Sequence, residues 1–165
     1  MRAEGLPEIV IETFKYYYSQ LVEGSTGFIA ERDIRPAENL PDAETFSEAT
    51  AQAGEAALPK TVFIKLNGGL GTSMGLAKAK SLLPVKEELS FLDIIAKQAL
   101  QAGARLVLMN SFNTRDDSLA ALRAHPALWE TGDALDFVQH KIPKVTQASL
   151  RPATYEQNPA LEWCP

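Results

Sequence analysis

The glycine-rich run Leu66–Gly75 is the part of the sequence whose residue types point most clearly to chemistry. It reads Leu-Asn-Gly-Gly-Leu-Gly-Thr-Ser-Met-Gly and directly follows a β-branched, apolar segment. Glycine has no Cβ, so the backbone can turn tightly and bring its N–H groups close to an anion. Lys78 and Lys80 follow within a few residues and add full positive charge. The pattern predicts a phosphate-binding loop.

Two common phosphate motifs do not fit this loop. A Walker loop needs a Gly-Lys-Ser/Thr ending, which is absent, and the dinucleotide pattern Gly-x-Gly-x-x-Gly would need a glycine at Met74. A glycine-rich turn can also be only a tight connection, and nearby lysines can form a solvated surface. On its own, the loop leaves a nucleotide site and a plain turn both open.

The distribution of charge favours an anion site at the same place. Residues 1–59 hold eleven acidic and four basic residues, whereas residues 60–86 hold five lysines and no acid. The net charge of −5 argues against nucleic acid or an anionic membrane as a partner. Because no stretch resembles a signal peptide or a membrane span, and the lone Cys164 cannot form an internal disulfide, we expect a cytoplasmic protein.

Hydrophobic spacing predicts the elements that position the loop. An amphipathic helix is expected at 7–22 and a weaker one at 42–53. Strands and helices then alternate, with strands at 61–66, 105–109 and 134–139 and helices at 91–102 and 115–124. The first strand is nearly all apolar, as expected for burial on both faces. This order is typical of a parallel sheet with crossover helices.

Local signals mark the ends of the two helices that follow the loop. Ser90 with Asp93 forms a capping pattern before the first helix, and Gly103 supplies its stop. Thr114 is expected to cap the second helix. Asn110 and Ser111, at the carboxyl end of the second strand, either line a site or form the turn into that helix.

Four blocks in register resemble the UTP–glucose-1-phosphate uridylyltransferase family. They are the loop 65–75, the pair Lys80-Ser81, the helix start Phe91-Leu92-Asp93 and the segment Leu-Met-Asn-Ser-Phe-Asn-Thr at 108–114. The likeness spans about residues 60–140. It implies an α/β fold, a partial Rossmann-like nucleotidyltransferase domain. In this interpretation, residues 1–58 are an N-terminal helical segment and connector, and residues 59–165 are the truncated N-terminal half of the nucleotide-binding catalytic domain.

The resemblance implies a role for each site residue. The loop would hold the uridine nucleotide through its backbone at Leu66, Asn67, Gly68 and Gly69, and would wrap the phosphates with Leu70, Gly71, Thr72, Ser73, Met74 and Gly75. Lys80 would neutralise phosphate charge during transfer and is the catalytic candidate. Gln139 would read the edge of the uracil.

The family's reaction is attack by a sugar 1-phosphate oxygen on the α-phosphorus of UTP, which releases pyrophosphate; with glucose 1-phosphate the product is UDP-glucose. UTP and a sugar 1-phosphate are therefore the implied partners. Magnesium is expected as a bridge between phosphates, but no carboxylate of this chain stands at a position that can be assigned to it. The residues that choose the sugar are expected beyond residue 165, so the chain alone is expected to be inactive.

Some features leave other interpretations open. The run Leu76-Ala77-Lys78-Ala79 stands where eukaryotic members usually carry Cys-x-Gly-Pro, which predicts a bacterial branch. A UDP-N-acetylhexosamine pyrophosphorylase is disfavoured, because such enzymes usually carry an Ala-Gly-Gly-Gln-Gly-Thr-Arg loop. A non-catalytic nucleotide-binding or scaffold module is the third interpretation. The exposed edges of a truncated sheet predict self-association.

Overall fold

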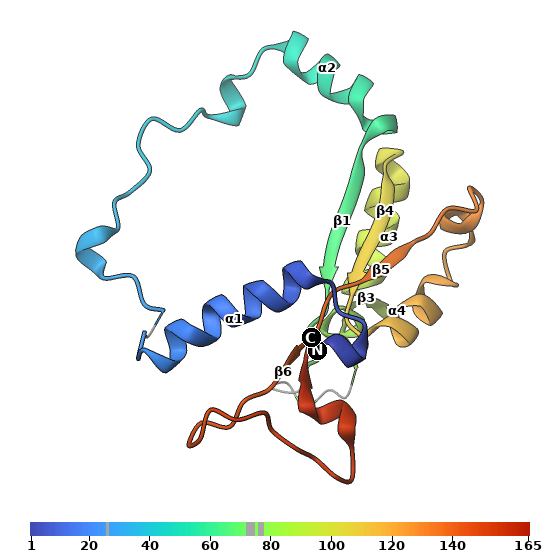
Figure 1. Cartoon of the computed structure of the whole chain (residues 1–165). Helices are drawn as coiled ribbons and strands as arrows, with labels where there is room; N and C mark the ends of the chain where they lie inside the picture. The colour runs from blue at the N-terminus through green and yellow to red at the C-terminus, as the bar shows by residue number, and fades with distance from the viewer. Residues whose placement is uncertain (26, 72–74, 76–77) are drawn as a thin grey trace. The chain divides into compact units, whose positions relative to one another are not determined.

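The computed structural model describes residues 1–165 except residues 26, 72–74 and 76–77. The chain, drawn in Figure 1, divides into two compact units. One contains Met1–Ala51 and Ile142–Cys164, and the other contains Gln52–Lys141 with Pro165. The glycine loop belongs to the second unit.

Helix α1 (Glu8–Val22) dominates the first unit and confirms the helix predicted at 7–22. Its Tyr18 hydroxyl donates a 2.8 Å hydrogen bond to the carbonyl oxygen of Leu150. The remaining elements of this unit are short: η1 (Arg2–Glu4), η2 (Glu31–Asp33), η3 (Ala43–Thr45), β6 (Ile142–Pro143), η8 (Pro159–Glu162) and β7 (Trp163–Cys164). Strands β6 and β7 pair antiparallel.

The weaker helix predicted at 42–53 forms later in the chain, as α2 (Glu48–Ala57). Asp42 caps the short turn η3 instead, because its carboxylate accepts the N–H of Glu44 at 3.0 Å. The Ser47 hydroxyl accepts the N–H of Thr50 at 3.3 Å and so begins α2. The turn η4 (Leu58–Lys60) follows α2, with Pro59 in its first turn.

The second unit contains a parallel three-stranded sheet, as the alternation of strands and helices predicted. Its strands are β1 (Val62–Asn67), β4 (Arg105–Asn110) and β5 (Asp136–Val138), in the order β1-β4-β5. The elements between these strands are η6 (Lys80–Leu82), β2 (Pro84–Lys86), β3 (Leu89–Ser90), α3 (Phe91–Ala102), α4 (Arg115–Leu122) and η7 (Pro126–Trp129). Figure 1 shows β1 and β4 side by side with α3 next to them.

The predicted capping box of α3 is confirmed. The Ser90 hydroxyl accepts the N–H of Asp93 at 3.2 Å, and the Asp93 carboxylate accepts the N–H of Ser90 at 2.9 Å. Gly103 ends the helix in the left-handed region with a φ of 65°. The predicted cap of α4 is wrong, because the side chain of Thr114 makes no cap hydrogen bond.

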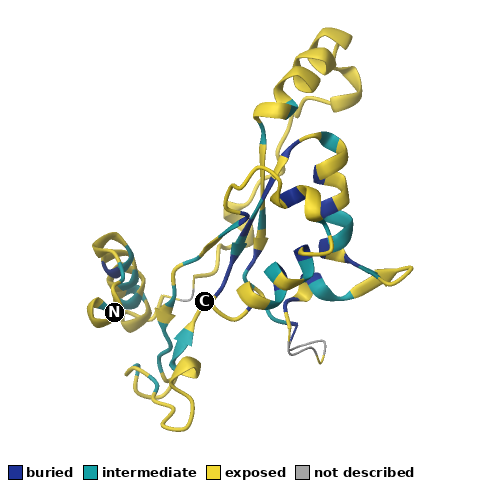
Figure 2. Cartoon of the chain, turned by 90° about the vertical axis from the view of Figure 1, so that its right-hand side faces the viewer, coloured by how far each residue is buried: buried dark blue, intermediate teal, exposed yellow. Residues whose placement is uncertain are grey.

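The hydrophobic core lies on one face of the sheet. It joins α3, β4, α4, η7 and the residue before β5 through Leu92, Ala96, Ala99, Leu106, Leu108, Leu122, Leu128 and Leu135. Figure 2 shows the buried residues of this unit gathered between strands and helices. The prediction that the first strand is buried on both faces is wrong, because Val62, Ile64 and Leu66 are 46, 57 and 66% exposed. These residues alternate along β1 and share the face that the core leaves open.

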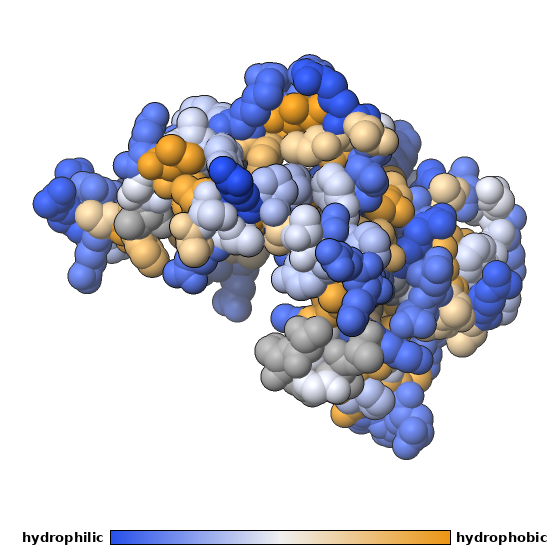
Figure 3. Space-filling view, turned by 60° about the horizontal axis from the view of Figure 1, so that its bottom comes forward, coloured by the Kyte–Doolittle hydropathy of each residue, from blue (hydrophilic) through white to orange (hydrophobic). Residues whose placement is uncertain are grey.

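Hydrophobic residues also reach the surface in several patches, drawn in orange in Figure 3. Within the residues that the structure covers, no helix combines the length and the apolar character needed to cross a membrane.

Candidate functional site

The three parallel strands end at the same edge of the sheet, where the predicted site residues meet. Asn67 pairs with Asn110 in the ladder, and Asn110 pairs with Val138. Gly68 and Gln139 follow the ends of the two outer strands. In open α/β sheets, ligands bind beyond the carboxyl ends of the strands. The structure therefore brings the start of the glycine loop and Gln139 together.

Backbone hydrogen bonds connect the described residues at the two sides of the glycine loop. The Gly71 N–H donates to the Lys78 carbonyl at 3.0 Å, and the Lys80 N–H donates to the Gly69 carbonyl at 3.1 Å. The Gly68 carbonyl accepts the Ser111 hydroxyl at 2.8 Å. Among the residues that the structure describes, none accepts a hydrogen bond from the N–H of Gly68 or Gly69. These two N–H groups, directly after β1, are available to bind an anion or a carbonyl oxygen.

Other predicted members of the loop are less informative. Leu66 and Leu70 adjoin the glycines in the described part of the chain, and Leu70 forms a bridge with Ala79. Gly75 is exposed and has a φ of 72°, which favours glycine. Thr72, Ser73 and Met74, which were predicted to wrap the phosphates, lie outside the described residues, as do Leu76 and Ala77.

The side chain of Gln139 lies directly against Gly68. Its backbone N–H donates to the Asn110 carbonyl at 2.7 Å, which fixes it at the end of β5. A Cβ at Gly68 would lie 2.6 Å from the Gln139 Oε1 and 2.8 Å from its Nε2. The carboxamide thus occupies space that only the absence of a side chain at Gly68 leaves open. A carboxamide has both donors and acceptors, as does the edge of a uracil ring.

Lys80 follows the loop with its alkyl chain beside Gly69. A Cβ at Gly69 would lie 4.0 Å from the Lys80 Cδ. Lys80 is exposed, and it lines a pocket of about 330 Å³ together with Lys65, Ser81, Leu83, Phe91 and Ile95. The lining of this pocket is almost entirely apolar, and the Lys65 ammonium donates to the Leu66 carbonyl.

A buried polar network lies beneath the loop and centres on Asn67. The Asn67 Nδ2 donates to the Asn110 Oδ1 at 2.7 Å and to the Ser118 Oγ at 2.8 Å, and its Oδ1 accepts the Ser81 hydroxyl. Both hydrogens of the Asn67 Nδ2 are therefore used within the protein, and its Oδ1 already accepts one hydrogen bond. Asn67 and Asn110 are both buried. Sequence reasoning missed Ser118, although it follows Thr114 by one helical turn and so shares its face.

Thr114 connects the ends of two strands instead of capping α4. Its hydroxyl donates to the Asn67 carbonyl at 2.7 Å and accepts the Ser111 N–H at 3.0 Å. With the Asn67 and Gly68 carbonyls both occupied, the backbone offers a ligand N–H groups rather than carbonyl oxygens at this point. Ser111 lies beneath the loop and is fully buried.

An ion pair between Arg115 and Asp136 lies at the edge of the network and determines which atom of the Asn110 carboxamide acts as the donor. Arg115 donates to Asp136 from Nε at 2.7 Å and from Nη2 at 3.3 Å, and Asn110 Nδ2 donates to the same carboxylate at 3.1 Å. Burial of the Asp136 carboxyl disfavours its charged form, but the hydrogen bonds from Arg115 and Asn110 outweigh this cost and hold its pKa below the ordinary value.

A second carboxylate, Asp93, belongs to the fold rather than to the glycine loop. Its Oδ1 lies 2.8 Å from the His125 Nε2, and its Oδ2 accepts the Ser90 N–H and hydroxyl. Burial opposes the charged carboxylate, but the hydrogen bonds from Ser90 and His125 together lower the pKa of Asp93. These contacts connect the start of α3 to His125, which directly precedes η7.

The described residues do not provide a magnesium site. None of their histidine, cysteine, aspartate and glutamate side chains form a group of three or more that could hold a metal ion. Near the loop, Asp136 is already committed to Arg115 and Asn110. No residue of the described chain is therefore assigned to a metal.

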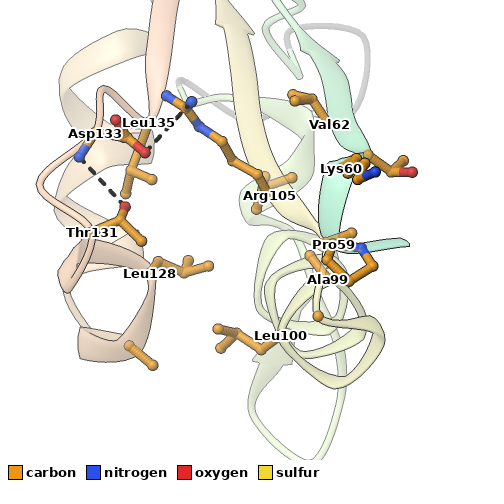
Figure 4. A pocket seen from close by; sticks show the side chains of 15 residues that line it. Pro59, Lys60, Val62, Ala99, Leu100, Arg105, Leu128, Thr131, Asp133 and Leu135 are labelled. Atoms are coloured by element: carbon orange, nitrogen blue, oxygen red, sulfur yellow. Dashed lines mark hydrogen bonds and ion pairs between the residues drawn. The ribbon is translucent and has the colours of Figure 1, made fainter. Parts of the chain in front are cut away.

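A larger pocket, of about 500 Å³, lies at the opposite edge of the sheet (Figure 4). Pro59, Lys60 and Val62 line it near the beginning of β1, and Arg105 lines it at the beginning of β4. The Arg105 Nη1 lies 3.5 Å from the Asp133 Oδ2, and both residues line this pocket. Because it lies at the amino ends of the strands, it is separate from the glycine loop.

Comparisons with known proteins agree on one family. The family model described as UTP–glucose-1-phosphate uridylyltransferase matches residues 11–165. The enzyme of that name from Solanum tuberosum is 37% identical over 115 residues, which cover 66% of this chain and 24% of the relative. The one from Saccharomyces cerevisiae is 34% identical over 161 residues, which cover 92% of this chain and 32% of the relative.

A solved structure shows the same fold. A variant of UDP-glucose pyrophosphorylase from Leishmania major, in complex with UDP-glucose, superimposes with a TM-score of 0.82 at 36% identity. The match covers 100% of this chain and 35% of that one. All three relatives are eukaryotic, so they do not support the bacterial branch predicted from Lys78 and its neighbours. The chain spans about a quarter to a third of the length of the relatives it matches.

Proposed function

The chain belongs to the UTP–glucose-1-phosphate uridylyltransferase family, and from this premise we propose that it is the UTP-binding part of an enzyme that makes UDP-glucose. In the proposed reaction, a phosphate oxygen of glucose 1-phosphate attacks the α-phosphorus of UTP. The bond between that phosphorus and the oxygen bridging to the β-phosphorus breaks, and pyrophosphate leaves.

The observation that carries the proposal is the pair of N–H groups at Gly68 and Gly69, which no described residue occupies. They follow β1 at the carboxyl edge of the sheet, where ligands of this fold class bind. The Gln139 carboxamide lies against the first of these glycines and the Lys80 stem lies beside the second. Two N–H donors, the carboxamide of Gln139 and the stem of Lys80 therefore lie together around Gly68 and Gly69.

Each of these groups has a separate task in the proposal. Gln139 pairs with the edge of the uracil, and the N–H groups of Gly68 and Gly69 hold the nucleotide against the end of β1. Lys80 places its ammonium where negative charge grows as pyrophosphate leaves. The nucleophile is already an anion, so the site contributes position and charge rather than a general base.

The other members of the predicted loop belong to the same proposal. Leu66, Leu70 and Gly71 continue the backbone on either side of the two glycines, and Thr72, Ser73, Met74 and Gly75 complete the loop around the phosphates. Magnesium remains an expectation for the whole protein, and no step is derived through it because the described residues do not fit it.

The alternatives receive no support from the relatives. The matched family and the two curated relatives are uridylyltransferases for glucose 1-phosphate, which does not favour an N-acetylhexosamine enzyme. We also propose that the chain self-associates when studied alone, because Val62, Ile64 and Leu66 present an exposed apolar face on β1. Gel filtration across a range of concentrations tests this second proposal.

Titration calorimetry with UTP tests the main proposal. It measures binding rather than turnover, because the chain spans only part of the length of its relatives. We expect saturable binding of UTP and weaker binding of ATP. Lys80→Ala should weaken UTP binding, whereas Lys97→Ala, which removes an exposed lysine of α3, should not. Equal binding of UTP and ATP, or equal effects of the two substitutions, would overturn the proposal.

A further inference from the structure

We propose that the side chains of Asn67 and Ser81 form a clasp that closes the glycine loop at its base and thereby positions Lys80. Both are positioning residues, since their side chains are buried and bonded within the protein. The nature of the ligand rests on the proposed function, but the clasp itself is a property of the chain without ligand.

The two residues stand at the two ends of the loop. Asn67 is the last residue of β1 and directly precedes Gly68, whereas Ser81 directly follows Lys80. The Ser81 hydroxyl donates to the Asn67 Oδ1 across 14 residues of chain. A hydrogen bond at this place fixes the distance between the two ends of the loop. It therefore also fixes the position of the Lys80 backbone, from which the side chain extends.

Burial makes this bond different from the backbone bonds of the loop. Asn67 and Ser81 are 4% and 7% exposed, whereas Gly69 and Lys80, whose backbones also bond to each other, are exposed. Water competes with a hydrogen bond at the surface, but a buried acceptor that loses its donor stays unsatisfied. The clasp therefore resists opening of the loop more than the exposed bond between Gly69 and Lys80 does.

The polar network determines which residue of the clasp donates the hydrogen bond and which accepts it. The Asp136 carboxylate can only accept, so the Asn110 Nδ2 must face it and the Asn110 Oδ1 must face Asn67. The Asn67 Nδ2 consequently points to Asn110, and the Asn67 Oδ1 is left to accept from Ser81. The charge of Asp136 thus orients two successive carboxamides and makes Ser81 the donor.

The test compares Ser81→Ala with Ser118→Ala. Each substitution removes one hydroxyl that bonds to the Asn67 carboxamide, but Ser118 lies in α4 and not at the loop. The readout is amide hydrogen exchange of Gly71 and Lys80, measured by NMR on the whole chain without ligand. Ser81→Ala should speed their exchange by about tenfold or more, as expected when a buried hydrogen bond is lost. Ser118→Ala should leave it near the wild-type rate.

A second pair of variants keeps the proposal testable if Ser81→Ala does not fold. Ser81→Thr and Ser81→Val have the same shape and differ in the hydroxyl, so any steric cost is shared. The clasp requires slow exchange at Lys80 in the threonine variant and fast exchange in the valine variant. Equal exchange in the two, or equal exchange in the two alanine variants, overturns the proposal.

Binding of UTP separates this proposal from the proposed function. If the clasp positions Lys80, the Thr variant should bind UTP about as the wild type does and the Val variant about tenfold more weakly. Faster exchange in the Val variant of a chain that binds no UTP would support the clasp and contradict the proposed function. Unchanged amide exchange in Ser81→Val of a chain that binds UTP would support the proposed function and contradict the clasp.

Discussion

Substitution of Gly68 by alanine perturbs the proposed uracil contact at a defined point. The new Cβ would lie 2.6 Å from the Gln139 Oε1 and 2.8 Å from its Cδ, which is closer than carbon and oxygen atoms approach without a bond. Because the backbone of Gly68 does not lie in the left-handed region, alanine can adopt it. The flexible carboxamide of Gln139 must therefore move, whereas the backbone at Gly68 can keep its conformation.

The energetic cost follows from this geometry. An alanine compatible with the backbone gains about 0.4–1 kcal/mol through the unfolded state, and a strained side-chain torsion costs about 0.5–1.5 kcal/mol. The free energy of unfolding should thus change by less than about 1 kcal/mol. Displacing Gln139 removes hydrogen bonds worth about 1 kcal/mol each, so the affinity for UTP should fall by about tenfold or more.

A double-mutant cycle with Gln139→Ala provides the assay, with UTP affinities from calorimetry. If the methyl group acts by displacing Gln139, the double variant should bind no more weakly than the worse single variant. The coupling energy then equals the smaller of the two single losses, about 1.4 kcal/mol for a tenfold loss. Gly54→Ala is the matched control, since a Cβ there meets nothing within 4 Å. Additive losses, or wild-type affinity in Gly68→Ala, would refute the reasoning.

Three further outcomes are expected for stability, measured by urea unfolding. Ser90→Ala removes the N-cap of α3 and should lower the free energy of unfolding by about 1 kcal/mol; an unchanged midpoint would contradict the capping box. Asp93 and Asp136 have pKa values below the ordinary 3.8, so their stabilisation is complete above that pH and is lost as the pH falls through the lower folded-state values. Stability that rises on acidification would contradict this sign. Arg115→Met should raise the folded-state pKa of Asp136, so the variant should be less stable than the wild type at neutral pH and should lose less stability on acidification; an acid limb of unchanged size would count against the ion pair.

Local signals explain why much of the fold could be predicted. The helix at 7–22 and the box of Ser90 with Asp93 depend on residues a few positions apart, and both are confirmed. The parallel order of the strands follows from their alternation with helices, and it is confirmed as well. The sequence carries these features because helix periodicity and caps are decided within one or two turns of chain.

Long-range partners explain the errors. Thr114 looks like a cap, but its hydroxyl bonds to the carbonyl of Asn67, 47 residues away. The apolar composition of β1 indicates two buried faces, yet composition does not say whether a second layer covers the strand, and Ile64 is 57% exposed. The network around Asn67 could not be predicted either, since its partners gather only when three strands and α4 come together.

The central claim is that the N–H groups of Gly68 and Gly69 receive a uridine nucleotide, and their NMR resonances test it most directly. During a titration with UTP, both amide resonances should shift saturably, together with the side-chain amide of Gln139. The N–H of Gly71, which is already bonded to Lys78, should shift less. Saturable binding of UTP that moves resonances elsewhere and leaves those of Gly68 and Gly69 unchanged would contradict the account.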